Sequence, residues 1–114
     1  MTNTNIIVID GHKAVLSYDP ELNMLRGEFI GLNGGADFYA SDIAGLMREG
    51  QTSLNEFLAV CKERGIEPVK KFSGKFQVRV EERVHADAVS AAAARGVSLN
   101  QFVAEAIEHE LQSA

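Results

Sequence analysis

The sequence predicts an α+β protein made of two modules, each with its own pattern of strands and helices. Over the first forty residues, short segments of strand-forming residues are separated by turn signals such as Asp10-Gly11 and Asp19-Pro20. An apolar repeat with helical spacing follows over residues 42–64. After residue 74, one alternating segment precedes two further helical segments. The order β-β-β-α and then β-α-α predicts a small antiparallel β-sheet with one packed helix, followed by a separate module.

Composition limits the classes of protein to which the chain can belong. With 114 residues, 46% of them hydrophobic, it can form one domain or two very small ones, and wholesale disorder is not expected. No apolar run approaches the ~20 residues of a membrane span. The N-terminal residues lack the basic region and long apolar core of a signal peptide, and a single cysteine, Cys61, suits a reducing compartment. We therefore expect a cytoplasmic protein with no membrane partner, in which Cys61 is a small core residue.

The net charge of −5 is low for a protein that binds nucleic acid. Residues 1–70 hold six Lys or Arg against ten Asp or Glu, a net charge of −4, and residues 71–114 hold five against six, a net charge of −1. The acidic first part suits a basic protein partner. In the second part Lys71, Lys75 and Arg79 lie close together, so any binding to DNA must depend on a few placed contacts.

The first module is expected to contain three strands. An apolar run at residues 6–9 ends in the turn signal Asp10-Gly11, and a second turn, Asp19-Pro20-Glu21-Leu22-Asn23, has Pro at the position that favours φ near −65°. The break between the second and third strands is Asn33-Gly34-Gly35. The expected strands are His12–Tyr18, Met24–Leu32 and Asp37–Ala40, which together form an antiparallel sheet.

One long helix completes the first module. Ser41 is a natural N-cap, and the apolar positions after it keep helical spacing across Gly50, where we expect the helix to be weakened or bent. Gly65 is a natural terminator. Residues 66–73 show no periodic pattern and are interpreted as a linker. The expected domains are therefore residues 1–65 and 74–114, joined by that linker.

The second module opens with a short strand at Lys75–Val80. Successive side chains of a strand point to opposite faces, and here apolar and polar residues alternate strictly. The apolar face consists of Phe76, Val78 and Val80, and the polar face consists of Lys75, Gln77 and Arg79.

Two helices follow this strand. The first, Val84–Arg95, is rich in alanine and ends before Gly96. Ser98 is a natural N-cap for the second helix, and Gln101 stands three residues later, where a capping box requires it. The spacing therefore predicts a well-capped second helix.

A module of about 40 residues cannot bury enough apolar surface by itself. Its lone strand would also have an unpaired edge. Both problems disappear if two chains pair their strands antiparallel and interlock their helices, so we expect a homodimer or a higher even oligomer. The residues expected to form the dimer core are Phe76, Val78, Val80, Phe102, Val103 and Ile107.

The polar face of the strand is the candidate DNA-reading surface. Lys75, Gln77 and Arg79 carry long hydrogen-bonding groups of the types that reach base edges, and a two-stranded ribbon fits the major groove. For the strand alone, a solvated polar face is the simpler interpretation. The dimer argument brings both copies of the three residues onto one surface and favours operator DNA as a partner.

These residues carry a family resemblance. The phrase SGKFQVRV…VHADAVSAAAARGVSLNQFVAEAIEHEL resembles ribbon–helix–helix DNA-binding domains and is more specifically similar to the C-terminal half of HicB-family antitoxins. The first half is also similar to that family, in the returning strand Gly27–Leu32 and the helix ending FLAVCKERGIEP. The resemblance covers about residues 6–111, and its most specific part is the junction GIEPVKKFSGKF.

The resemblance implies a fold and two activities. The first half would be a truncated ribonuclease-H-like module that binds and neutralises a small basic, mRNA-cleaving toxin of the HicA kind. The second half would be a ribbon–helix–helix dimer that represses its own operon. The start of the second helix, at Ser98, Leu99 and Asn100, would clamp a DNA phosphate with its backbone amides. Where many relatives have proline after the strand, this chain has Glu81 and Glu82, which predicts weaker DNA binding.

Two other functions remain open from the sequence. One is a stand-alone transcriptional regulator whose first module senses a ligand or oligomerises. The other is a metal-dependent nuclease, although no convergent carboxylate set is evident and each candidate has an ordinary structural interpretation. We therefore expect no enzymatic activity, no bound metal and no cofactor. The candidate carboxylates are Asp10, Asp19, Glu28, Asp37 and Asp42.

Overall fold

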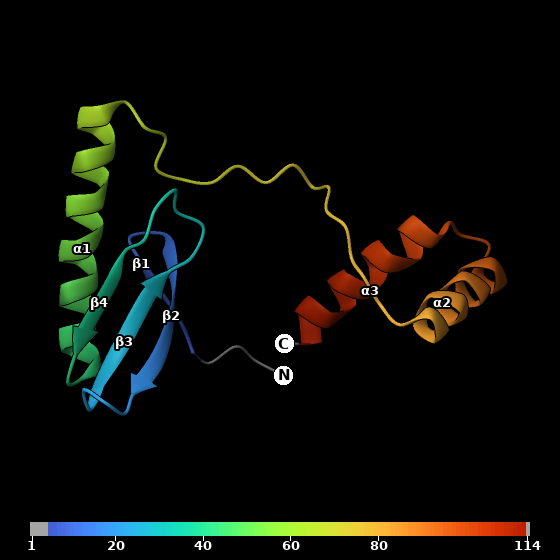
Figure 1. The fold of residues 1–114 in the computed structure, drawn as a ribbon, viewed down its shortest axis with the longest axis horizontal. Coiled ribbons are helices and arrows are strands. Elements are labelled where there is room, and N and C mark those ends of the chain that lie inside the picture. The colour runs from blue at the N-terminus through green and yellow to red at the C-terminus, as the bar shows by residue number, and fades with distance from the viewer. Residues whose placement is uncertain (1–4, 114) are drawn as a thin grey trace. The chain divides into compact units, whose positions relative to one another are not determined.

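The computed structural model describes residues 5–113 and divides them into two compact units (Figure 1). The N-terminal unit ends at Phe72, and the C-terminal unit begins at Ser73. The structure confirms an α+β protein with an antiparallel sheet and a packed helix in its first part. None of the helices in the described range is long and apolar enough to cross a membrane.

The sheet has four strands, so the expectation of three was wrong. The apolar run at residues 6–9 forms an additional edge strand, which pairs with the next strand from Ile6 opposite Val15 to Ile9 opposite His12. Its hairpin turn is Asp10-Gly11, with φ of 52° and 82°, a geometry that suits the twist of paired strands. The strands are β1 (Ile6–Ile9), β2 (His12–Asp19), β3 (Met24–Phe29) and β4 (Asp37–Ala40), in that order across the sheet.

The four-residue run IIVI lacks the polar alternation by which a half-exposed strand is recognised. In the sheet its inward side chains, Ile7 and Ile9, pack on the core, while Ile6 and Val8 are exposed. The strand is therefore defined by its pairing with β2, which a local pattern cannot show.

The second turn has the predicted chemistry. Asp19 Oδ1 accepts hydrogen bonds from the amides of Glu21 (3.0 Å) and Leu22 (3.2 Å), and Asn23 has a positive φ of 52°. Tyr18 donates its hydroxyl hydrogen bond to Asn23 Oδ1 at 2.7 Å. The turn therefore sets the register between β2 and β3, in which Asp19 lies opposite Met24.

One helix, α1 (Ile43–Arg64), packs on the sheet (Figure 1). Its N-cap is Asp42 rather than the predicted Ser41, because Asp42 Oδ1 accepts the amide hydrogen of Gly45 at 2.6 Å. A carboxylate at this position also complements the positive end of the helix dipole. The predicted stop at Gly65 is confirmed: its φ is 66°, and its amide faces the carbonyls of Cys61 and Lys62.

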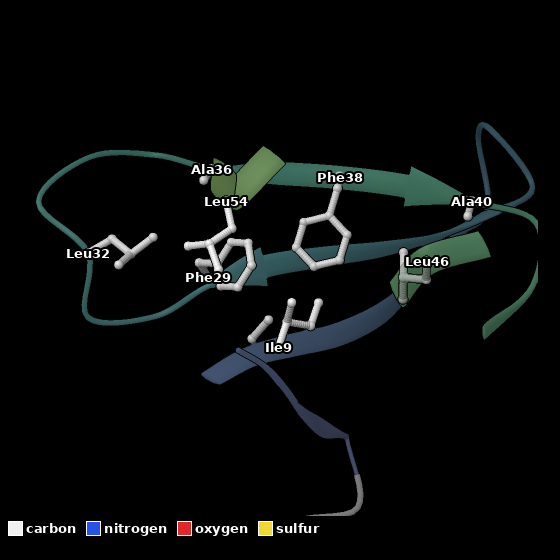
Figure 2. Packing of buried hydrophobic residues seen from close by; sticks show 9 residues of the cluster. Ile9, Phe29, Leu32, Ala36, Phe38, Ala40, Leu46 and Leu54 are labelled. Carbon is white, nitrogen blue, oxygen red and sulfur yellow. The ribbon is translucent and has the colours of Figure 1, made fainter. Parts of the chain in front are cut away.

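The core of the N-terminal unit lies between α1 and one face of the sheet (Figure 2). Phe29 and Phe38, from neighbouring strands, have ring centroids 5.1 Å apart, and Leu46 and Leu54 of α1 are fully buried. Cys61 is also buried, as expected of a small core residue. This unit therefore has a continuous hydrophobic core of its own.

Two glycines make room for the ring of Phe38. A Cβ atom built on Gly27, its neighbour across the β3–β4 pair, would overlap the ring. A Cβ atom built on Gly50 would overlap both the ring and Ile9 Cδ1. Gly50 is thus a point of close approach between helix and sheet inside an unbroken helix, which explains why glycine is tolerated there.

The last residues of the N-terminal unit run back along the β3–β4 loop. Val69 forms an isolated β-bridge with Leu32, and Asn33 donates hydrogen bonds to carbonyl groups of this returning segment. Part of the predicted linker 66–73 is therefore fastened to the N-terminal unit.

The C-terminal unit contains two helices, α2 (Glu82–Arg95) and α3 (Leu99–Ser113). The first begins two residues before the predicted start, and Gly96 ends it with φ of 70°. Residues 75–80 form no strand in the single chain. A strand is defined by hydrogen bonds to a neighbour, and the neighbour expected from the sequence belongs to a second chain.

The close approach at Gly50 yields a stability prediction. Gly50→Ala would stabilise an isolated helix by about 1 kcal/mol, but here we expect a net loss of about 1–3 kcal/mol, because the new methyl group overlaps Phe38 and Ile9. Urea unfolding is followed by tyrosine fluorescence. Tyr18 and Tyr39 are the only two tyrosines, so the signal reports the N-terminal unit alone.

Thr52→Ala is the matched control, since Thr52 is exposed on the same helix. We expect the control to leave the unfolding midpoint unchanged or slightly raised. A midpoint for Gly50→Ala at or above that of the control would contradict the close-approach interpretation.

Candidate nucleic-acid interface

The segment 75–80 exposes its apolar side chains to solvent. Phe76, Val78 and Val80 are 72%, 60% and 49% exposed, respectively. Such exposure is unusual for three large apolar residues so close together in the sequence. Within residues 73–113, Ala92 is the only buried residue. The C-terminal unit therefore has no core within one chain.

The segment and the two helices border an open apolar groove. The hollow has a volume of about 790 Å³, and its lining includes Val80, Val84, Phe102 and Ile107. Gln77 and Arg79 also line it. In the single chain, polar and apolar side chains of the segment therefore border the same hollow.

The predicted DNA-contacting residues are accessible. Lys75, Gln77 and Arg79 are exposed, and neither Lys75 nor Arg79 takes part in an ion pair within the described residues. Lys75 and Asn100 line one small hollow of about 240 Å³, so the structure brings a residue of the strand segment to the start of α3. Their assignment as DNA contacts stays a prediction.

The start of α3 has the predicted cap but lacks the full capping box. Ser98 Oγ accepts the amide hydrogen of Gln101 at 3.0 Å. The Gln101 side chain does not return to Ser98; it donates to Glu105 Oε1 at 3.0 Å, so the capping-box prediction was wrong in its second half. Among the described residues, the amides of Leu99 and Asn100 have no protein acceptor. They are the free donors that a helix start offers to an anion.

The contact between the two helices includes a residue that the sequence did not single out. The guanidinium carbon of Arg95 lies 5.1 Å from the centroid of the Phe102 ring, a cation–π geometry. Arg95 also lies in the last turn of α2, where a positive charge complements the helix dipole. The sequence signal was ordinary, a basic residue at a helix end, and the aromatic partner depends on how α2 and α3 pack.

The acidic residues after the strand segment are partly balanced by a neighbour. Arg83 Nη2 lies 3.9 Å from Glu81 Oε2, and Arg83 Nη1 lies 3.5 Å from Asp87 Oδ2. All three side chains are largely exposed, so these pairs contribute little to stability. Glu82, in the first turn of α2, complements the positive end of that helix. The negative charge after the segment is thus moderated by Arg83.

The candidate carboxylates of the N-terminal unit have separate structural roles. Asp42 caps α1 and Asp19 orders a turn. Glu28 and Asp37 both pair with Arg26, at 3.2 Å and 2.5 Å, and the hydrogen bond to Asp37 raises the pKa of the Arg26 guanidinium. Asp10 lies in the hairpin turn with φ of 52°. No group of three or more metal-ligating side chains occurs in the described part of the chain.

Comparison with known proteins gave one match. The model of the HicB family matches residues 57–107, slightly under half of the chain. The matched range begins in the last two turns of α1, crosses the boundary between the units, and ends in α3. No curated protein and no solved structure matched the chain. The match supports a HicB-family protein and is compatible with an antitoxin of a toxin–antitoxin system.

Proposed function

We propose that the protein is an antitoxin of a type II toxin–antitoxin system. Its N-terminal unit, a partial ribonuclease-H-like module, neutralises a small basic HicA-like toxin that cleaves mRNA, by direct binding. Its C-terminal unit forms a ribbon–helix–helix dimer that represses the operon encoding both proteins. The observation that carries the proposal is the family match, which continues from one unit into the other.

The missing core of the C-terminal unit supports a dimer. Each large apolar side chain that a partner covers contributes about 1.5–3 kcal/mol, and Phe76, Val78 and Val80 all stand exposed. A second copy that pairs its segment 75–80 antiparallel would also supply the missing backbone hydrogen bonds. Two copies of the open groove, bordered by Phe102 and Ile107, would then close over these side chains. Assembly into a dimer or a higher even oligomer would therefore both cover the exposed apolar side chains and pair the backbone of segment 75–80.

Pairing would also create the DNA-reading surface. In a two-stranded ribbon Lys75, Gln77 and Arg79 of both chains lie on the face opposite the core, and such a ribbon fits the major groove. The free amides of Leu99 and Asn100 would hold a phosphate beside it. Because residues 71–114 have a net charge of −1, recognition depends on these placed contacts more than on general attraction.

The charge of residues 1–70 supports a basic protein partner. Residues 1–70 have a net charge of −4, which favours encounter with a basic ribonuclease and disfavours RNA itself. In this proposal, the protein is not an enzyme and needs no cofactor. It works in the cytoplasm and is associated with the nucleoid when it is bound to its operator. Toxin, operator DNA and a second copy of the chain are its proposed partners.

Coexpression with the product of an adjacent gene tests the proposal. We expect that gene to encode a small basic protein whose expression arrests growth, and we expect this chain to restore growth and to co-purify with it. Operator binding without a toxic neighbour would instead indicate a stand-alone regulator. Cleavage of RNA by the purified chain with Mg²⁺ or Mn²⁺, abolished by carboxylate substitution, would indicate a nuclease.

Dimer formation is tested by Phe76→Asp. We expect the substitution to convert the dimer to monomers in sedimentation velocity, because the dimer would have to bury an unpaired charge. Leu22→Asp is the matched control: Leu22 is an exposed apolar residue in a turn of the N-terminal unit, and its substitution should leave the dimer intact. A Phe76→Asp protein that sediments as the wild-type dimer would exclude the proposed ribbon.

Operator reading is tested by Arg79→Ala. If Arg79 contacts a base, we expect the affinity for promoter DNA of the operon to fall by about 1–3 kcal/mol. Arg83→Ala removes the same charge from an exposed residue of α2 and should have a much smaller effect. Fluorescence anisotropy with labelled DNA at fixed salt measures both variants. Equal losses for the two variants would assign Arg79 a general electrostatic role and not a base contact.

A further inference from the structure

Residues 67–70, here called the strap, are hydrogen-bonded to the β3–β4 loop of their own unit. The amide of Lys70 donates to the Gly31 carbonyl at 2.8 Å, and the amide of Asn33 donates to the Pro68 carbonyl at 2.9 Å. The Asn33 side chain adds two more bonds, from Nδ2 to the carbonyls of Glu67 (2.8 Å) and Val69 (3.3 Å). The strap is thus held along its whole length.

Asn33 is the centre of this attachment. Its side-chain nitrogen donates to two strap carbonyls, and its backbone N–H donates to a third. The preceding residue, Leu32, is buried in the core of the unit. The loop that holds the strap is therefore itself fixed by hydrophobic packing, and Asn33 transmits that rigidity to residues 67–70.

The chain after the strap contains little free backbone. Ser73 Oγ accepts the amide hydrogen of Lys75 at 3.0 Å, and Gly74 has φ of 84°, so a local turn opens the C-terminal unit. With the strap attached, residues 71–74 connect the units and can span at most about 14 Å. With the strap released, the connection would begin after Gly65 and could span about 30 Å.

We propose that Asn33 is a positioning residue, which holds the strap against the N-terminal unit and so sets the short distance over which the two units are joined. The inference rests on the proposed function in one respect: the joining distance determines how closely a protein bound to the N-terminal unit is held to DNA bound by the C-terminal unit. A shorter connection raises the effective concentration of one bound partner at the other. The strap itself requires neither partner.

Hydrogen exchange of the full-length protein tests the attachment. In Asn33→Ala and Asn33→Asp, we expect the Lys70 amide to exchange roughly three- to tenfold faster, as for the loss of one or two hydrogen bonds. Asn33→Asp keeps the shape of the side chain but turns an oxygen towards carbonyl oxygens, so its effect should be at least as large. The Ile30 amide, which donates to the Lys13 carbonyl, is the internal reference and should not change.

Asn55→Ala is the matched control variant. Asn55 is an exposed asparagine of α1 whose side chain bonds only to Gln51 among the described residues, so its loss should leave the Lys70 amide protected. Wild-type exchange at Lys70 as fast as in an unstructured peptide, or equal exchange in the Asn33 and Asn55 variants, would overturn the inference.

Small-angle scattering tests the joining distance. We expect a larger radius of gyration for Asn33→Asp than for wild type and Asn55→Ala at equal concentration. Faster exchange at Lys70 with an unchanged radius would overturn the positioning role. Neither measurement uses toxin or DNA, so a failure of toxin neutralisation or operator binding would be recognised separately.

Discussion

The ring of Phe38 can lie in the N-terminal core only because two positions around it lack a side chain. Gly27 leaves space across the strand pair, and Gly50 leaves space on the helix, so that α1 approaches the sheet closely at this point. Two core residues of α1, Leu46 and Leu54, lie one turn to either side of Gly50 and are fully buried. The position of the helix on the sheet, and with it the whole unit, depends on this one fit.

The C-terminal unit, unlike the N-terminal unit, has no core within one chain. Its helices are well formed at their ends, with Ser98 capping α3 and Gly96 ending α2, yet between them they bury Ala92 alone. Local signals can shape helices, but the stability of short helices comes mostly from packing. The two units therefore combine one self-sufficient core with one exposed apolar surface, which the proposed dimer would cover.

Those parts of the structure that depend on neighbours in sequence were predictable. The turn-forming residues Asp10-Gly11 and Asn23 predicted the positions of two turns. Helical spacing predicted the extent of α1, and Gly65 predicted its end. The strand β1 was missed because four apolar residues carry no period, and Gly50 was interpreted as a weak point because its contact with Phe38 is distant in sequence. Asn33 looked like a simple strand break, since its partners stand 34 and 36 residues later.

In the candidate interface, too, contacts between residues close in sequence were predictable and contacts between distant residues were not. The cap at Ser98 was predictable because its partner, Gln101, is three residues away. The pairing of Arg95 with Phe102 was not, because it requires the two helices to be packed. The polar face of segment 75–80 is visible in the sequence as alternation, but the single chain provides no ladder to fix it.

In the proposed dimer, the two units would respond differently to the concentration of the protein. A fold completed within one chain does not change with concentration, whereas a fold completed by a second chain weakens by mass action as the protein is diluted. For the proposed dimer, falling protein levels would therefore loosen the C-terminal unit first, while the N-terminal unit keeps its fold. In the proposed antitoxin, dilution would therefore weaken DNA binding by the C-terminal unit before it weakens toxin binding by the N-terminal unit.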